Sequence, residues 1–158
     1  MSTTQKQTVP FVVSGSGVGV LQRIEVGGGG APHVFSTDTV PPFGGDDAQP
    51  SPLSYVLGAL TGCNQITAQL VAKDLGVTLG RFSADAVGDF DPSVLAAGAE
   101  GNANFDAIRV EITVQTDADD ATFDRLRSET ERRCPVTQLA IRSGLEFSST
   151  WNRAPLAG

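Results

Sequence analysis

Residues that crosslink secreted domains or hold structural metals are scarce in this sequence. Of 158 residues, only two are cysteine and one is histidine. Two cysteines are too few for a secreted disulfide scaffold, and structural zinc sites use closely spaced pairs of ligands. The available ligands lack that spacing: Cys63, Cys134, His33 and either Asp46 or Asp47. We therefore expect no metal, no cofactor, and two thiols in a reducing compartment.

Basic residues and long apolar runs are also few. Lys and Arg total 11 against 18 Asp and Glu, which gives a net charge of -7, so the surface should repel nucleic-acid phosphates. No stretch approaches the roughly 18 consecutive apolar residues of a membrane helix, and residues 1–13 do not match a secretory signal peptide. We expect a cytoplasmic protein with no nucleic-acid partner and no membrane association.

The length and the hydrophobic patterning predict one domain, residues 1–158, of which residues 1–10 form a flexible N-terminus. Apolar residues alternate over residues 18–26, and a short apolar run follows at 33–35, which predicts two or three antiparallel strands. The four glycines at 27–30 lie between these segments. No Gly-Lys-Ser/Thr follows them and no helix opens there, so a hairpin loop is favoured over a phosphate-binding loop.

Helical and extended segments fill the rest of the chain. Apolar residues spaced by three and four predict a long helix over residues 52–75, with Ser51 as its N-cap. A second helix should end near Cys134, because Pro135 disfavours helical geometry in the residue before it, and a short third helix should begin at that proline. The other expected elements are strands near 82–90, 108–114 and 145–151, a loop over 92–105, and an ion pair between Glu129 and Arg133.

The two cysteines differ in their local settings. Cys63 lies on the apolar stripe of the long helix, where an isolated thiol is most often a core residue. It is too far from the start of that helix for the helix dipole to activate it. Cys134 precedes a proline that opens a helix and follows Arg132 and Arg133, a setting that favours a thiolate. The residues themselves thus favour Cys134 as the reactive thiol. A lone histidine such as His33 is more often a surface residue than a catalytic one.

Four short segments follow one another in a characteristic order: 41–52 (PPFGGDDAQPSP), 57–64 (LGALTGCN), 71–77 (VAKDLGV) and 133–136 (RCPV). In this order and spacing they resemble the OsmC/Ohr family of osmotically induced and organic-hydroperoxide-resistance proteins, from about Val18 to Trp151. The resemblance implies an α+β fold with antiparallel sheets packed on long central helices. It also implies an intertwined homodimer with its sites at the subunit interface.

The resemblance further implies a thiol-dependent peroxidase that reduces organic hydroperoxides. Cys63 matches the cysteine that attacks the peroxide, and Cys134 matches the one that resolves the sulfenic acid into a disulfide, which a thiol or dithiol then reduces. Many members carry a Glu one or two residues after the proline that matches Pro52, where this chain has Leu53 and Ser54. That Glu anchors an activating Arg in the family.

We assign the remaining site residues on the same basis. Arg23 is the candidate for the activating Arg, and three residues are expected at the substrate: His33, Leu60 and Ile66. The alternative hypothesis is a non-catalytic small-molecule binding protein on the same fold, which the missing Glu favours and the two matched cysteines oppose.

Overall fold

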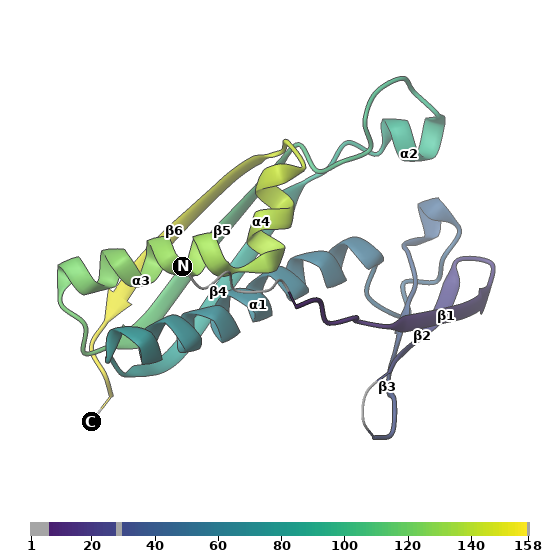
Figure 1. Ribbon diagram of the computed structural model, residues 1–158. Helices are drawn as coiled ribbons and strands as arrows, with labels where there is room; N and C mark the ends of the chain where they lie inside the picture. Colours follow the sequence, from purple (N-terminus) through teal and green to yellow (C-terminus); the bar gives the residue numbers. More distant parts are fainter. Residues whose placement is uncertain (1–6, 28–29, 158) are drawn as a thin grey trace. The chain divides into compact units, whose positions relative to one another are not determined.

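The computed structural model describes residues 7–27 and 30–157 (Figure 1). Two compact units make up the chain, Met1–Ser54 and Tyr55–Gly158, and each is described by itself. Residues 1–6 of the expected flexible N-terminus, and two of the four glycines at 27–30, lie outside the described residues. The single-domain organisation stays a prediction.

The first unit contains a three-stranded antiparallel sheet of order β1-β2-β3. Its strands are β1 (Val13–Val18), β2 (Leu21–Val26) and β3 (His33–Thr37). The expectation of two or three antiparallel strands is confirmed, but the alternating segment 18–26 is not continuous, because a turn at Gly19 separates β1 from β2. Gly19 has a φ of 66°, a left-handed conformation that glycine adopts without steric cost and that other residues seldom adopt. Alternation in the sequence alone did not reveal this turn.

A buried carboxylate organises the loop that follows β3. Asp38 accepts hydrogen bonds from the backbone N–H groups of Ala48 (3.0 Å), Thr39 (2.8 Å) and Asp46 (3.2 Å). These bonds hold the pKa of the Asp38 carboxyl below its usual range, because they stabilise the charged form. The loop, including the short 3-10 helix η1 (Pro41–Phe43), is therefore fixed by one side chain.

Helix α1 (Pro52–Leu75) extends over 24 residues, as expected. The Ser51 hydroxyl oxygen accepts a hydrogen bond from the Ser54 N–H at 3.2 Å, and Pro52 occupies the first helical position. Gly76, with a φ of 70°, ends the helix. These signals at both ends explain why the helix boundaries follow from the sequence.

The second unit contains a three-stranded sheet of order β4-β5-β6. Its strands are β4 (Leu79–Asp89), β5 (Ala107–Thr116) and β6 (Glu146–Ala154). Strands β4 and β5 form the expected hairpin, but β6 pairs parallel to β5, so the prediction of purely antiparallel sheets is wrong for this one. Parallel pairing needs a long crossover, and helices α3 (Asp120–Arg133) and α4 (Pro135–Arg142) provide it. The chain is thus an α+β protein.

Two local expectations for this unit are also wrong. The segment 92–105 contains a short helix, α2 (Ser93–Ala97), where a loop was expected. The Asp91 carboxylate accepts a hydrogen bond from the Ser93 N–H at 2.8 Å, which supports the first turn of α2. Glu129 pairs with Arg132 at 2.7 Å instead of Arg133. Both i,i+3 and i,i+4 spacings place charges on one helix face, so the spacing did not decide between them.

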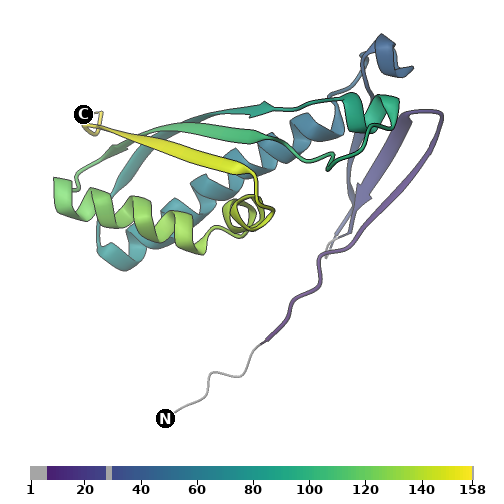
Figure 2. The ribbon, with the colours of Figure 1, turned by 90° about the horizontal axis from the view of Figure 1, so that it is seen from above.

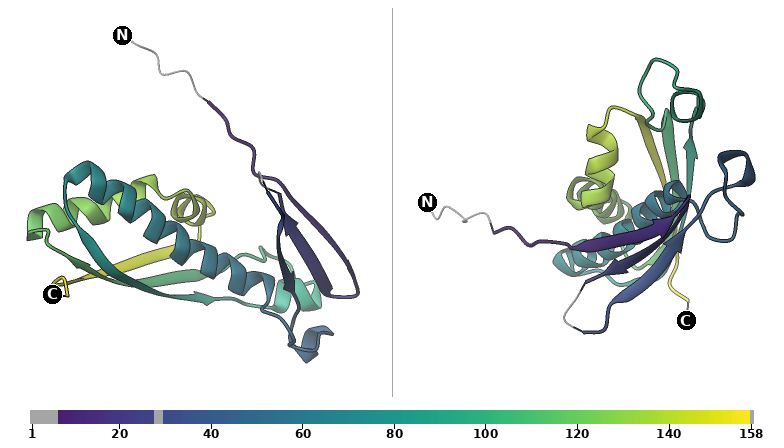
Figure 3. Two further views of the ribbon diagram at one scale, coloured as in Figure 1. Left: turned by 90° about the horizontal axis from the view of Figure 1, so that it is seen from below. Right: turned by 90° about the vertical axis from the view of Figure 1, so that its right-hand side faces the viewer.

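The core of the second unit lies between one face of its sheet and the helices α1 and α3, which run along that face (Figures 2 and 3). Alternate residues of β5 point into it, while the intervening residues are exposed or only partly buried. The buried cluster comprises Val71, Ala72, Val114, Ala118, Phe123 and Leu126. This packing holds α1 and the start of α4 on the same side of the sheet.

Leu126 is the test of this core, because its side chain is fully buried on α3. We expect Leu126→Ala to lower the free energy of unfolding by about 2 to 5 kcal/mol through lost burial and a residual cavity. Leu95→Ala, at a leucine that is 64% exposed, should change it by less than about 0.5 kcal/mol. Urea unfolding measures both, and equal losses in the two variants would contradict the assigned core.

Candidate functional site

Helices α1 and α4 bring the two cysteines together. Cys63 lies in the middle of α1, and Cys134 is the residue that separates α3 from α4. Both are free thiols; Cys63 is half-buried and Cys134 is fully buried. Burial raises the pKa of the Cys63 thiol, and a hydrogen bond with the Cys134 side chain raises it further. Residues far apart in the chain thus form one dithiol site.

The first turn of α4 supplies backbone donors to both sulfur atoms. The Thr137 N–H donates to Cys134 Sγ at 3.5 Å, so Cys134 caps the helix with its own side chain. The Val136 N–H donates to Cys63, which opposes the rise in its pKa. The early N–H groups of a helix have no partner within the helix and favour negative charge. The backbone donor that favours the anion of Cys63 therefore comes from α4, although α1 carries the residue.

Two residues of α1 complete the surroundings of Cys63. The Thr67 hydroxyl, one turn further along the helix, hydrogen-bonds to the Cys63 thiol and also lowers its pKa. Burial remains the largest effect, so the net shift in the pKa is upward. Asn64, the next residue in the chain, is buried beside this site and donates to Thr137 Oγ1 at 3.1 Å. Within residues 55–157, Cys63 is therefore a thiol with partial stabilisation of its anion.

The arginines before Cys134 are engaged elsewhere. Arg132 pairs with Glu129, and Arg133 pairs with Asp74 of α1 at 2.6 Å. The sequence suggested that these two side chains stabilise a thiolate at Cys134, but their positive charges are already paired with carboxylates. What remains beside Cys134 is the backbone at the start of α4.

Arg23 and His33 belong to the first unit, and the structure describes each within that sheet. Arg23 lies on β2 and forms an ion pair with Glu25, two residues along the same strand. Its side chain is about half exposed. His33 is the first residue of β3, is exposed, and pairs in register with Val26. Their roles stay predictions.

An apolar cavity of about 140 Å³ lies close to the thiols. Leu60, one turn before Cys63, and Val136, whose N–H reaches Cys63, both line it. Most of the other lining residues are apolar: Val56, Phe105, Ile108, Leu139, Ala140 and Leu145. Ile66 does not line this cavity; it is 66% exposed on the open side of α1, one turn after Cys63. Of the predicted substrate residues, Leu60 is thus the one at the cavity.

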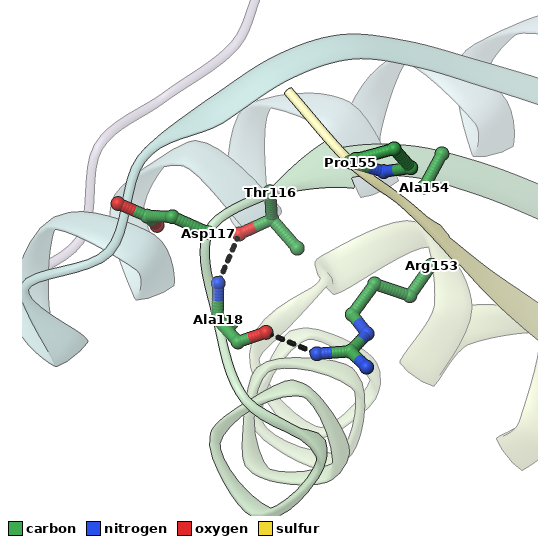
Figure 4. Close-up of a pocket in the computed structure, with 6 residues that line it drawn as sticks. All are labelled: Thr116, Asp117, Ala118, Arg153, Ala154 and Pro155. Atoms are coloured by element: carbon green, nitrogen blue, oxygen red, sulfur yellow. Dashed lines mark hydrogen bonds between the residues drawn. The ribbon is translucent and has the colours of Figure 1, made fainter. Parts of the chain in front are cut away.

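A larger cavity, about 350 Å³, lies at the opposite end of β5 and is polar (Figure 4). Arg153 lines it and donates to the Ala118 carbonyl, while the Ala118 N–H donates to Thr116 Oγ1 at 3.1 Å. Arg153 also pairs with Asp120. With its cation already paired and no thiol in its lining, this cavity offers no group for the chemistry of the cysteines.

Among residues 7–27 and 30–157, no three His, Cys, Asp or Glu side chains lie close enough together to hold a metal ion. Over the same described part of the chain, no helix combines the length and the apolar character needed to cross a membrane.

Three polar residues at the site were not expected from the sequence: Asn64, Thr67 and Thr137. All three are buried. A signal was present for two of them, because Asn64 and Thr67 continue the inward-facing stripe of α1 that contains Leu60 and Val71. Buried polar residues on an apolar stripe need hydrogen-bond partners, which makes them candidates for a site. Nothing in the sequence indicated Thr137.

Comparison with known proteins identifies the fold and the family of the chain. Structures of an OsmC-like protein from Mycoplasma pneumoniae (TM-score 0.72, 14% identity, 94% of this chain and 99% of that one) and of an organic hydroperoxide resistance protein from Elizabethkingia anophelis (0.72, 16%, 95% and 100%) have the same fold. So does the organic hydroperoxide resistance protein OhrB of Bacillus subtilis (0.58, 17%, 91% and 98%). No curated protein sequence matches. The profile of the OsmC-like protein family matches residues 44–150, a stretch that includes both cysteines, and the chain belongs to that family.

Proposed function

We propose that this protein is a thiol-dependent peroxidase that reduces organic hydroperoxides. The observation that carries the proposal is the contact between the Cys63 and Cys134 thiols at the start of α4. Two thiols in contact can be oxidised together, losing two electrons and two protons, to form a disulfide. The family to which the chain belongs also supports this proposal, as do the names of two structural neighbours, both organic hydroperoxide resistance proteins.

The chemistry divides into three balanced steps. The Cys63 thiolate attacks the terminal oxygen of the hydroperoxide; the O–O bond breaks, an alcohol leaves with a proton, and Cys63 becomes a sulfenic acid. Cys134 then attacks the sulfenic sulfur, the S–O bond breaks, and the oxygen leaves as water with the Cys134 proton. The resulting disulfide returns to the dithiol by exchange with a thiol or dithiol reductant, as expected in a cytoplasmic setting.

The apolar cavity gives the proposed substrate class. Leu60 and Val136 line this cavity and are neighbours of Cys63, so we propose that the cavity receives the organic substituent of a hydroperoxide whose peroxide group reacts at the thiol. Its lining is mostly apolar, with Asn104 and Ser143 as the polar residues, so it suits an organic substituent better than hydrogen peroxide or water. Ile66 flanks Cys63 on the exposed side of α1 and is a second proposed contact. Arg23, as activator, and His33, as substrate contact, stay proposals that rest on the resemblance.

A non-catalytic binding protein on the same fold is the second candidate. The raised pKa of Cys63 favours it, because a protonated thiol is a poor nucleophile. The same apolar cavity would then hold a small hydrophobic molecule without reaction. Absence of any Cys63 oxidation after one equivalent of cumene hydroperoxide would select this candidate.

The roles of the two cysteines are tested by substitution. We expect Cys63→Ser to abolish consumption of cumene hydroperoxide, because the attacking sulfur is lost. Cys134→Ser should retain one turnover and leave a sulfenic acid on Cys63 that a dimedone probe traps, with subsequent over-oxidation. Mass spectrometry after one equivalent of peroxide measures both. Probe attached to Cys134 in the Cys63→Ser protein, with turnover retained, would reverse the assignment.

The raised pKa of Cys63 predicts the pH dependence of the first step. Only the thiolate reacts, and below its pKa the ionised fraction grows about tenfold per pH unit. The single-turnover rate should therefore increase by about that factor per unit from pH 7 to 8 and still be rising at pH 9. The Cys134→Ser variant, measured in parallel, assigns the profile to Cys63. A plateau reached below pH 8 would contradict the raised pKa of Cys63.

Exposed apolar side chains on α1 and α4 support the proposed homodimer: Val56, Ile66, Leu70, Leu139 and Ile141. Surfaces of this kind are typical of subunit interfaces. We expect a dimer at micromolar protein that buries more than about 2,000 Å². Ile66→Glu should shift it toward monomer in sedimentation equilibrium, while Leu95→Glu, on α2, should not. A wild-type protein that sediments as a monomer would overturn the prediction.

A further inference from the structure

Asn64 and Thr137 form a buried hydrogen bond that joins α1 to the first turn of α4. Asn64 Nδ2 donates to Thr137 Oγ1 at 3.1 Å, and its second N–H donates to the Leu60 carbonyl oxygen, one turn earlier in α1, at 2.9 Å. A carbonyl oxygen can only accept, so the orientation of the amide is settled by Leu60. Asn64 is 2% exposed and Thr137 is fully buried. The bond is therefore shielded from competing water.

The same threonine also contacts a thiol. The Thr137 N–H donates to Cys134 Sγ at 3.5 Å, while Asn64 directly follows Cys63 in the chain. Asn64, the residue after Cys63, is therefore linked by its side chain to Thr137, and Thr137 is linked by its backbone N–H to the sulfur of Cys134.

We infer that Asn64 and Thr137 are positioning residues for the condensation of Cys134 with the oxidised Cys63. The inference rests on the proposed peroxidase function and adds to it the residues that govern its second step. A disulfide tolerates little misplacement, since the sulfur atoms must reach about 2.05 Å and the Cβ atoms about 3.8 Å. In that step Cys134 attacks the Cys63 sulfur, the S–O bond breaks, and water leaves. Looser registry between α1 and α4 slows it and leaves the sulfenic acid open to a second peroxide.

The chain offers a matched set of substitutions for the test. Thr137→Val keeps the shape of the side chain but removes the acceptor for Asn64, and Thr137→Ser keeps the hydroxyl. Thr130→Val is the control, because Thr130 is equally buried and its hydroxyl has no hydrogen-bond partner among the described residues. The Thr130 carbonyl that accepts the Cys134 N–H remains in that variant.

The first measurement needs no peroxide. Diamide accepts the two hydrogens of the dithiol as the disulfide forms, and the intramolecular step is read at concentrations where the rate no longer depends on diamide. We expect Thr137→Val to form the disulfide about three- to tenfold more slowly, the effect of about one net hydrogen bond. Thr137→Ser and Thr130→Val should stay within about twofold of wild type. A wild-type rate in Thr137→Val, whatever its thermal stability, would overturn the inference.

The second measurement uses cumene hydroperoxide. In Thr137→Val, Cys63 should be over-oxidised to sulfinic acid about three- to tenfold more often per turnover than in wild type. The reason is that loss of one hydrogen bond slows disulfide formation relative to the reaction of the sulfenic acid with a second peroxide. If wild type forms no sulfenic acid with peroxide, the proposed function fails, while the diamide result still decides the positioning role. Should Thr137→Val not fold, Thr137→Ala removes the same hydroxyl with a residue of higher helix propensity. An equal fraction of turnovers ending in sulfinic acid in wild type and in the folded variant would contradict the inference.

Discussion

Pro135 is the constraint on which the geometry of the site depends. A proline inside a helix removes a backbone donor and clashes with the preceding turn, at a cost of about 3 kcal/mol or more. The chain therefore leaves helical geometry at Cys134, whose ψ is 113°, and begins α4 at the next residue. This break aims the free N–H groups of a new helix at two sulfur atoms. An uninterrupted helix through residue 134 would use those donors internally.

Burial and ionisation oppose one another at Cys63. Exclusion of water lets apolar side chains reach the thiol, but the same desolvation raises its pKa. Backbone N–H donation from Val136 and the Thr67 hydroxyl partly offset this effect, and neither carries a full charge. The arginines nearest in sequence to Cys134 are paired with carboxylates. Within residues 55–157 the site thus favours a protected thiol over a permanently ionised one.

The sequence predicts those parts of the molecule that depend on local signals. The ends of α1 follow from Ser51, Pro52 and Gly76, and the break at Cys134 follows from Pro135, because caps and prolines act within one turn. The turn at Gly19 and the parallel pairing of β6 did not emerge. A turn inside an alternating segment does not alter its pattern, and strand direction is decided by where the crossover helices pack.

The site shows the same division. Spacing and resemblance indicated Cys63 and Cys134, but their contact depends on the packing of α4 against α1, which has no local signature. Asn64 lay on a recognisable buried stripe, whereas its partner Thr137 is a polar residue in a short helix like many others. The sequence excluded the dipole of α1 as a source of activation at Cys63, but it did not indicate that α4 would supply a backbone donor. A dipole from a second helix requires knowledge of tertiary structure.

The parallel alignment of β5 and β6 has a consequence for how the chain folds. Between these strands lie both crossover helices, and a crossover of this length closes a large loop before its contacts stabilise it. Cys63 belongs to a helix that can begin to form early, whereas the segment that caps its sulfur is made about 70 residues later. During synthesis on the ribosome, Cys63 therefore exists for a time without its partner thiol or its backbone donors. Until α4 packs against α1, the Cys63 thiol is therefore without the donor and the second thiol that surround it in the folded protein.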